Sequence, residues 1–318
     1  MIKVTSNLKI LAILTIYFTF LASIGEAQKL ESTPYLRTEH AIKPLYFSFI
    51  NPSKPNATAR ITSAIGYLSG TSEARKRIRS FYANTLVRIA HKDSLSQTHF
   101  LGIGISSEQD GPILARNEFT LKYELRQPIN SFSFLKAGVD FGTLNYDIGS
   151  QGSNGGISIF IPTGHIGASY VYKNRSEIGI AINQMFNSTF DIGTDQPTRL
   201  IRHYNIHGSH QLKLNQLHDV NLFVWDKYVP ETENRFGGYA TYLYLSKFTL
   251  SIGLDSDFKA ITNPQSTSNT RGVFTLGVTN WQLDQNNLID AFIAYSAPIN
   301  NTSISFANIE FGINYRML

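Results

Sequence analysis

The chain has 318 residues, a formal net charge of +5 and no cysteine, so neither a disulfide scaffold nor a lipid-modified N-terminal cysteine is possible. Aromatic residues make up 12% of the chain and charged residues only 16%, a balance that suits a lipid-facing β-barrel better than a soluble enzyme. The charges are scattered and form no basic stripe, which argues against a nucleic-acid partner.

Residues 1–27 have the pattern of a secretory signal peptide. Lys3 and Lys9 supply the basic start, Ile10–Ile24 is the apolar run, and Gly25-Glu26-Ala27 is a small-x-small cleavage sequence. The alternative is an uncleaved membrane anchor, but an apolar run of about fifteen residues is short against the roughly twenty that span a bilayer. We therefore predict cleavage before Gln28.

Residues 28–56 are polar and contain four prolines, at Pro34, Pro44, Pro52 and Pro55. We interpret them as an N-terminal segment that lies in the periplasm or enters the lumen of a barrel. Residues 57–318 are predicted to form the barrel itself.

From residue 57 onward, short segments alternate apolar and polar side chains. Ile178, Ile180 and Ile182, for example, share one face of a strand. The absence of a helical interlude predicts an all-β fold, a closed antiparallel transmembrane β-barrel of about 14 strands. The predicted strands are residues 57–67, 79–90, 98–106, 117–127, 132–144, 164–172, 176–183, 200–213, 219–228, 235–245, 247–258, 271–281, 287–296 and 304–315.

The connections between these segments tend to be alternately long and short. The long set includes Asn145–Thr163 and Gln184–Arg199, whereas the short set includes Lys173–Arg175 and the single residue Ser246. Outer-membrane barrels have short periplasmic turns and longer outer loops. The alternation therefore predicts an integral protein of the Gram-negative outer membrane with periplasmic N- and C-termini.

The last predicted strand shows which face meets lipid. Ala307, Ile309, Phe311, Ile313 and Tyr315 alternate with residues suited to a polar lumen, namely Asn308, Glu310, Gly312, Asn314 and Arg316. Because a charged side chain facing lipid at mid-bilayer costs about 2–4 kcal/mol, this alternation largely fixes the register.

The histidines do not form a convincing catalytic or metal site. On a strand His203 and His207 lie about 13 Å apart and His210 points to the opposite face, which is too far for one ion. Ser209 and His210 also face opposite sides, so they cannot act as nucleophile and base. We therefore expect no enzyme activity, no cofactor and no metal.

Several loose motifs follow one another along the chain. They are Asn51-Pro52-Ser53, the glycine strand Leu101–Ile105, the loop Asp110-Gly111-Pro112, Leu121–Leu125, the strand Leu135–Leu144 with Gly138 and Gly142, and the ending Phe311–Arg316. In this order they resemble the PorP/SprF family of Bacteroidota outer-membrane proteins, which is linked to type IX secretion and gliding motility. The ending Met317-Leu318 departs from the terminal aromatic residue common in outer-membrane barrels, so we expect a divergent member.

This resemblance implies a non-enzymatic accessory of protein secretion. The implied partners are other type IX secretion or gliding components and the C-terminal domain of a secreted adhesin-like cargo, with outer-membrane lipid or lipopolysaccharide around the barrel. We expect docking on the outer loops 145–163 and 184–199 and a basic cluster in the first outer loop. The candidate docking residues are Arg75, Lys76, Arg77, Arg79, Phe160, Phe186 and Phe190.

Two other functions stay open from the sequence. The first is a passive pore or transporter for small solutes, which a lumen-facing charge ladder and conductance in planar bilayers would favour. The second is an enzyme in the barrel wall that acts on lipid, which the strand geometry of Ser209 and His210 disfavours.

Overall fold

The structure is a computed structural model that describes residues 59–71, 77–89, 97–110, 114–149, 157–186, 188–190, 198–230, 234–257, 270–299 and 307–318. All of these residues belong to one compact unit, Thr33–Leu318. The predicted signal peptide and the predicted N-terminal segment 28–56 lie outside the described residues. In the described ranges, no helix has the length and apolar character needed to cross a bilayer.

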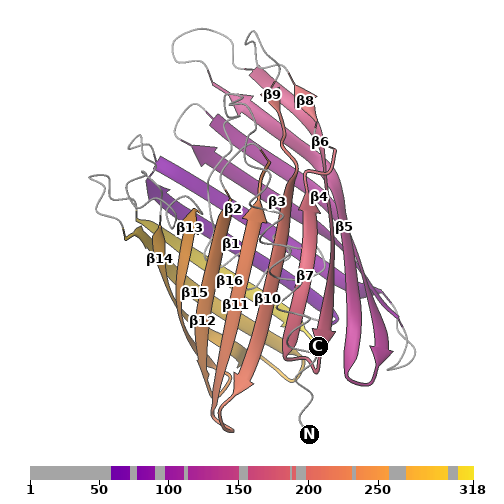
Figure 1. Ribbon diagram of the computed structural model, residues 1–318, viewed down its shortest axis with the longest axis vertical. Coiled ribbons are helices and arrows are strands. Elements are labelled where there is room, and N and C mark those ends of the chain that lie inside the picture. Colours follow the sequence, from indigo (N-terminus) through magenta and orange to yellow (C-terminus); the bar gives the residue numbers. More distant parts are fainter. Residues whose placement is uncertain are drawn as a thin grey trace, which may run out of the picture. The chain divides into compact units, whose positions relative to one another are not determined.

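The described strands form one closed antiparallel barrel of 14 strands and a separate two-stranded hairpin (Figure 1). Each predicted strand range overlaps one barrel strand, so the predicted fold class is confirmed. The barrel strands are β1 (Ile61–Thr71), β2 (Arg77–Ile89), β3 (Thr98–Asp110), β4 (Leu114–Asn130), β5 (Ser133–Ile148), β6 (Ile157–Tyr172), β7 (Ser176–Asn183), β10 (His203–Lys213), β11 (His218–Tyr228), β12 (Arg235–Tyr244), β13 (Phe248–Asp257), β14 (Arg271–Gln282), β15 (Asn287–Pro298) and β16 (Asn308–Met317).

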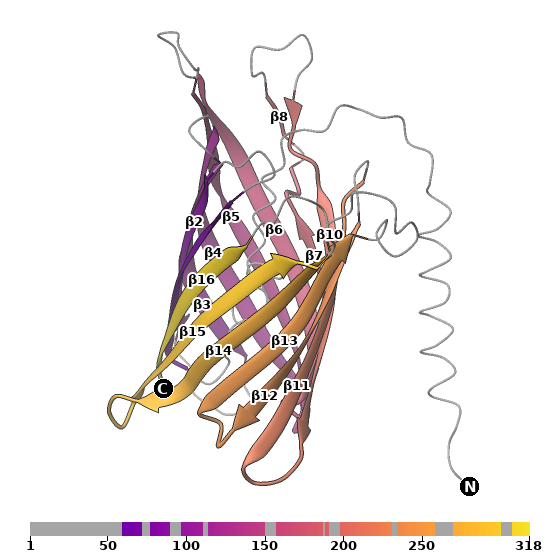
Figure 2. The same ribbon diagram turned by 90° about the vertical axis from the view of Figure 1, so that its left-hand side faces the viewer.

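The first and last strands close the barrel. β1 pairs with β16 from Ile61 opposite Met317 to Gly70 opposite Asn308. Closure leaves no open edge inside a bilayer, where water cannot satisfy backbone N–H and C=O groups. The pairing also puts the start of β1 and the end of β16 at the same end of the barrel, which is the end of the short turns (Figure 2).

The two faces of the wall have the predicted characters. On β16, Ile309, Phe311 and Ile313 are exposed on the outside, whereas Glu310 and Asn314 are buried on the lumen side. The other strands repeat this alternation, so an apolar band surrounds the barrel as lipid requires.

Five of the six connections at one end are short, and the sixth, residues 90–97 between β2 and β3, has eight residues. The connections 131–132, 173–175, 214–217, 245–247 and 283–286 contain two to four residues. Two of these turns contain consecutive residues in the left-handed region, Lys173 and Asn174 with φ of 52° and 53°, and Leu245 and Ser246 with φ of 56° and 52°. Paired positive φ values are typical of tight hairpin turns whose twist matches the strands.

The opposite end differs from the prediction in two respects. β5 continues to Ile148 and β6 begins at Ile157, so much of the predicted loop 145–163 is strand. The predicted loop 184–199 contains a small hairpin of β8 (Thr189–Phe190) and β9 (Thr198–Arg199), which pair with each other outside the barrel sheet. β4, β5 and β6 are the longest strands, with 17, 16 and 16 residues, and they rise above the other strands in Figure 1.

Inward-facing aromatic rings lie over glycines on the neighbouring strand. In each case the ring and the glycine are directly opposite in the register, and a Cβ at the glycine would lie 2.0–2.5 Å from a ring atom. Each ring therefore fills the space of the missing side chain and stays against the wall. The pairs are Tyr82 over Gly66, Trp225 over Gly237, Tyr239 over Gly253 and Phe292 over Gly277.

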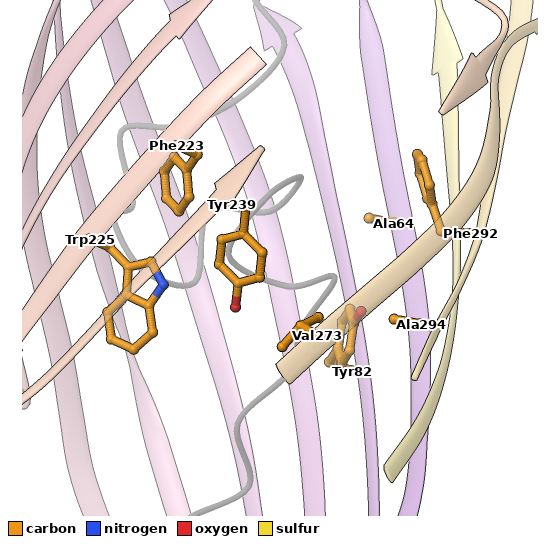
Figure 3. Packing of buried hydrophobic residues seen from close by; sticks show 8 residues of the cluster. All are labelled: Ala64, Tyr82, Phe223, Trp225, Tyr239, Val273, Phe292 and Ala294. Carbon is orange, nitrogen blue, oxygen red and sulfur yellow. The ribbon is translucent and has the colours of Figure 1, made fainter. Parts of the chain in front are cut away.

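These rings form the main apolar cluster of the lumen side. Tyr82, Phe223, Trp225, Tyr239 and Phe292 lie there with Ala64, Val273 and Ala294, as Figure 3 shows. The hydroxyl of Tyr82 also donates a hydrogen bond of 2.8 Å to Glu310 of β16. One ring thus ties the first two strands to the last strand.

We predict that Gly66→Ala lowers the stability of the folded barrel. The new Cβ would lie 2.0 Å from Cζ of Tyr82, so the ring has to move and its hydrogen bond to Glu310 is lost. Overpacking of this kind costs about 1–3 kcal/mol, which urea unfolding of the purified protein in detergent measures. Gly238→Ala is the control, because the heavy atom nearest to its new Cβ lies 3.7 Å away, and an equal loss in both variants would contradict the prediction.

Candidate docking surface and lumen

The lipid-facing band ends before β4, β5 and β6 do. On β5, outward-facing apolar residues run from Leu135 to Phe141, and the next outward positions are Thr143, Asn145 and Asp147. Phe141 lies opposite Gly164 of β6, and the outward positions of β6 beyond Gly164 are Pro162, Phe160 and Ser158. The strand segments beyond this level form what we call the extended wall, made of Ala115–Glu118 of β4, Thr143–Asp147 of β5 and Ser158–Thr163 of β6.

The extended wall has an apolar core of its own on the lumen side. Leu144, Tyr146 and Ile161 are buried there together with Leu200, which follows β9 in the chain, and Ile159 packs against them. This second core explains why the wall keeps strand structure beyond the band that lipid supports.

One edge of the extended wall has no partner strand among the strands that the structure describes. β6 pairs with β5 along its whole length but with β7 only from His165 to Tyr172. Two carbonyls beyond His165 are bonded by the chain that follows β7, since Met185 N–H donates to Gly164 O at 2.9 Å and Ser188 Oγ donates to Pro162 O at 3.2 Å. Among the described strands, none pairs with this edge at Ser158 and Phe160.

The extended wall presents apolar side chains on its outer face. Phe160 is 73% exposed, the largest value among the large hydrophobic residues of the described part of the chain. Phe186 packs on Phe141 with ring centroids 6.1 Å apart and lies over Gly164, where a Cβ would meet it at 2.7 Å. The structure therefore brings two of the candidate docking residues, Phe160 and Phe186, to the outer side of one wall.

The other candidate docking residues lie elsewhere or are not described. Arg79 is exposed on β2, four strands from β6, which corresponds to roughly 19 Å along the sheet. Arg75 and Lys76 lie outside the described residues, and the side chains of Arg77 and Phe190 lie outside them too. Arg79 and Phe160 therefore belong to separate places on the barrel.

The strand character of residues 157–163 was not predicted. A signal was present, because Ile157, Ile159 and Ile161 alternate with Ser158 and Phe160. The outward positions Ser158, Phe160 and Pro162 nevertheless carry no continuous lipid-facing pattern.

Several charged residues of the lumen side are paired with opposite charges on other strands of the wall. Lys122 of β4 contacts Asp140 of β5 at 2.5 Å, and both side chains are buried. Lys136 of β5 contacts Glu177 of β7 at 3.2 Å. These pairs lower the cost of enclosing charge in the wall.

A third ion pair lies at the last three strands. Nη2 of Arg316 donates to Asp290 at 2.6 Å and to Asn280 at 2.8 Å. Asp290 also accepts from the side chain of Asn314 at 2.9 Å and from the backbone N–H of Asn280 at 2.7 Å. This network joins β14, β15 and β16 at the strand that closes the barrel.

The histidines of β10 lie on both faces of the wall. His203 and His207 are buried on the lumen side, and His207 lies 3.5 Å from Glu177. His210 faces outward and shares a hydrogen bond of 2.8 Å with Ser176. Within the described ranges, no group of three histidine, cysteine or carboxylate side chains is arranged to hold a metal ion.

A closed antiparallel barrel with an apolar outer band and a polar, ion-paired inner face defines an integral outer-membrane protein. Comparison of the sequence with protein families identifies the family within this class. The family model described as "Type IX secretion system membrane protein PorP/SprF" matches residues 46–279, and the chain belongs to this family.

Solved barrels resemble this chain in fold. The CymD monoaromatic hydrocarbon channel is 12% identical, with 84% of this chain and 91% of that chain covered at a TM-score of 0.55. A FadL homologue of Pseudomonas aeruginosa is 10% identical, with 82% and 90% covered and a TM-score of 0.55. The Pseudomonas putida toluene transporter TodX is 10% identical, with 86% and 94% covered and a TM-score of 0.50. No curated protein matches the sequence.

We predict that Asp290→Ala destabilises the barrel by about 3–5 kcal/mol, because the guanidinium of Arg316 stays in the wall without its carboxylate. The double variant Asp290→Ala with Arg316→Met should recover most of the loss, because it removes the charge as well. Urea unfolding of both variants in detergent measures the difference. A double variant no more stable than Asp290→Ala would contradict the assigned role of the pair.

Proposed function

We propose that this barrel is a non-enzymatic accessory of type IX secretion that docks a partner protein on the extended wall. The partner is the C-terminal domain of a secreted adhesin-like cargo or another component of the secretion or gliding machinery. The proposal accords with the family, whose members are membrane proteins of type IX secretion. The observation that carries it is the 73% exposure of Phe160 beyond the lipid-facing band.

An exposed phenylalanine is expected among lipids but is unfavourable in water. Phe160 is two outward positions beyond Gly164, and its outward neighbour across the β5–β6 register is the polar Asn145. Covering an apolar side chain of this size stabilises a complex by about 1.5–3 kcal/mol. Large aromatic side chains of this kind dominate many protein interfaces.

The unpaired edge of β6 suggests how the partner binds. In an antiparallel ladder the backbone N–H and C=O groups of every second residue point away from a given neighbour strand. On β6 the groups of Gly164 and Pro162 point away from β5, so those of Phe160 and Ser158 do as well. An extended strand of the partner can add to this edge through main-chain hydrogen bonds, with Phe160 beside it as an apolar anchor. Pro162 has no N–H to donate, so the part of the β6 edge that can pair with a partner strand is limited to Phe160 and Ser158.

We predict that Phe160→Ser reduces recovery of the partner roughly thirtyfold, the effect of losing a contact worth about 2 kcal/mol. The measurement is quantitative mass spectrometry of proteins that co-purify with the tagged full-length chain from outer membranes. Leu283→Ser is the matched control, because Leu283 is 56% exposed on the β14–β15 turn at the opposite end. Equal partner recovery with Phe160→Ser and with Leu283→Ser would reject the extended wall as the docking surface.

A small-solute channel is the second candidate, and the apolar cluster on the lumen side favours it. The ion-paired lumen charges favour the docking function instead, because paired charges form no ladder for a permeating solute. We therefore predict that the full-length barrel reconstituted in planar bilayers shows no steady conductance in potassium chloride. Steady single-channel openings would support the channel.

A further inference from the structure

The β6–β7 turn presents two cations at the short-turn end of the barrel. Lys173 and Arg175 are exposed. Lys173 and the next residue, Asn174, have left-handed backbone angles, with φ of 52° and 53°. The N–H of Lys173 donates to the carbonyl of Phe132 in the β4–β5 turn at 2.6 Å. The carbonyl of Arg175 accepts from Gln211 of β10 at 2.8 Å. The turn is therefore held between its two neighbours in the wall.

No described carboxylate neutralises Lys173 or Arg175. Glu177, two residues after Arg175, is directed to the lumen side and pairs with Lys136 at 3.2 Å. The next cation along this end of the wall, Lys213, differs, because it lies directly opposite Asp219 in the β10–β11 register. Lys173 and Arg175 thus form a local excess of positive charge.

Aromatic rings place this charge at the edge of the lipid-facing surface. The ammonium of Lys173 lies 5.2 Å from the ring centroid of Tyr172 and 5.7 Å from that of Phe132. Both rings are exposed, and Tyr172 is the last outward residue of β6 before the turn. Aromatic residues and long cationic side chains in such positions lie at the level of the lipid headgroups.

We propose that Lys173 and Arg175 bind the phosphate of an anionic phospholipid whose acyl chains pack against the outer faces of β4–β7. We choose a lipid headgroup as the anion because the two cations lie beside an apolar wall with aromatic residues at its edge, at the level of the headgroups. The guanidinium of Arg175 can hold two phosphate oxygens at once, and the ammonium of Lys173 adds a point charge beside them. The inference does not depend on the docking function, since it concerns the opposite end of the barrel.

The test is native mass spectrometry of the detergent-purified full-length chain titrated with phosphatidylglycerol. Phosphatidylcholine with the same acyl chains is the uncharged comparison. We expect tighter binding of phosphatidylglycerol, and we expect Lys173→Gln with Arg175→Gln to weaken it roughly fivefold for each charge removed. The matched control is Lys213→Gln with Lys247→Gln, which removes two exposed cations from other positions at the same end and should leave binding unchanged.

Three results would overturn the assignment. The first is equal affinity for phosphatidylglycerol and phosphatidylcholine in the wild-type protein. The second is an equal loss in both double variants, which would mean that only net charge matters. The third is lipopolysaccharide binding that is tighter than phosphatidylglycerol binding and depends on Lys173 and Arg175.

Discussion

The constraint on which this structure depends is that hydrocarbon offers no partner to a backbone N–H or C=O group. A sheet inside a bilayer must therefore close, and β1 and β16 close this one along ten registered residue pairs. The same constraint explains where the sheet can open. β6 and β7 stay paired up to His165 and separate beyond it, at the level where the outward apolar series of β5 ends at Phe141. Beyond that level water can solvate a free edge, so the edge at Ser158 and Phe160 is possible only outside the band.

The lumen side shows how a barrel forms a core without a second layer. Several of its charged residues form cross-strand pairs, such as Lys122 with Asp140, and four of its aromatic rings lie on glycines such as Gly66. In both the ion pairs and the ring–glycine contacts, a large side chain lies along the wall and contacts a specific residue on another strand. The lumen side is therefore a packed surface whose pairs depend on register, so a slip of one residue between two strands would expose charge to lipid.

The sequence predicted the strands that lipid supports, because the period of two is strong wherever one face must be apolar. It failed at the extended wall, where Thr143, Asn145 and Asp147 replace apolar residues on the outer face of β5, although the lumen side keeps apolar residues such as Leu144 and Tyr146. β8 and β9 have two residues each, too few to produce a periodic signal. Phe160 was expected to contribute to docking because it lay in a long predicted loop, whereas the structure places it on a strand edge that no described strand covers. The pairing of Tyr82 with Gly66 depends on the register of β1 and β2, which alternation within one strand does not give.

β6 connects the two ends of the barrel that carry the proposed interactions. Tyr172 lies at the short turn and Phe160 lies twelve residues earlier on the same strand. Twelve residues span roughly 40 Å of strand, or roughly 30 Å along the membrane normal at a tilt of about 40°. The apolar band of an outer-membrane barrel is about 25 Å tall, so Phe160 stands about 5 Å beyond it when Tyr172 lies at the opposite boundary. A phospholipid held at Lys173 and Arg175 would fix that boundary, and through the rigid strand it would also fix the height at which Phe160 meets a partner.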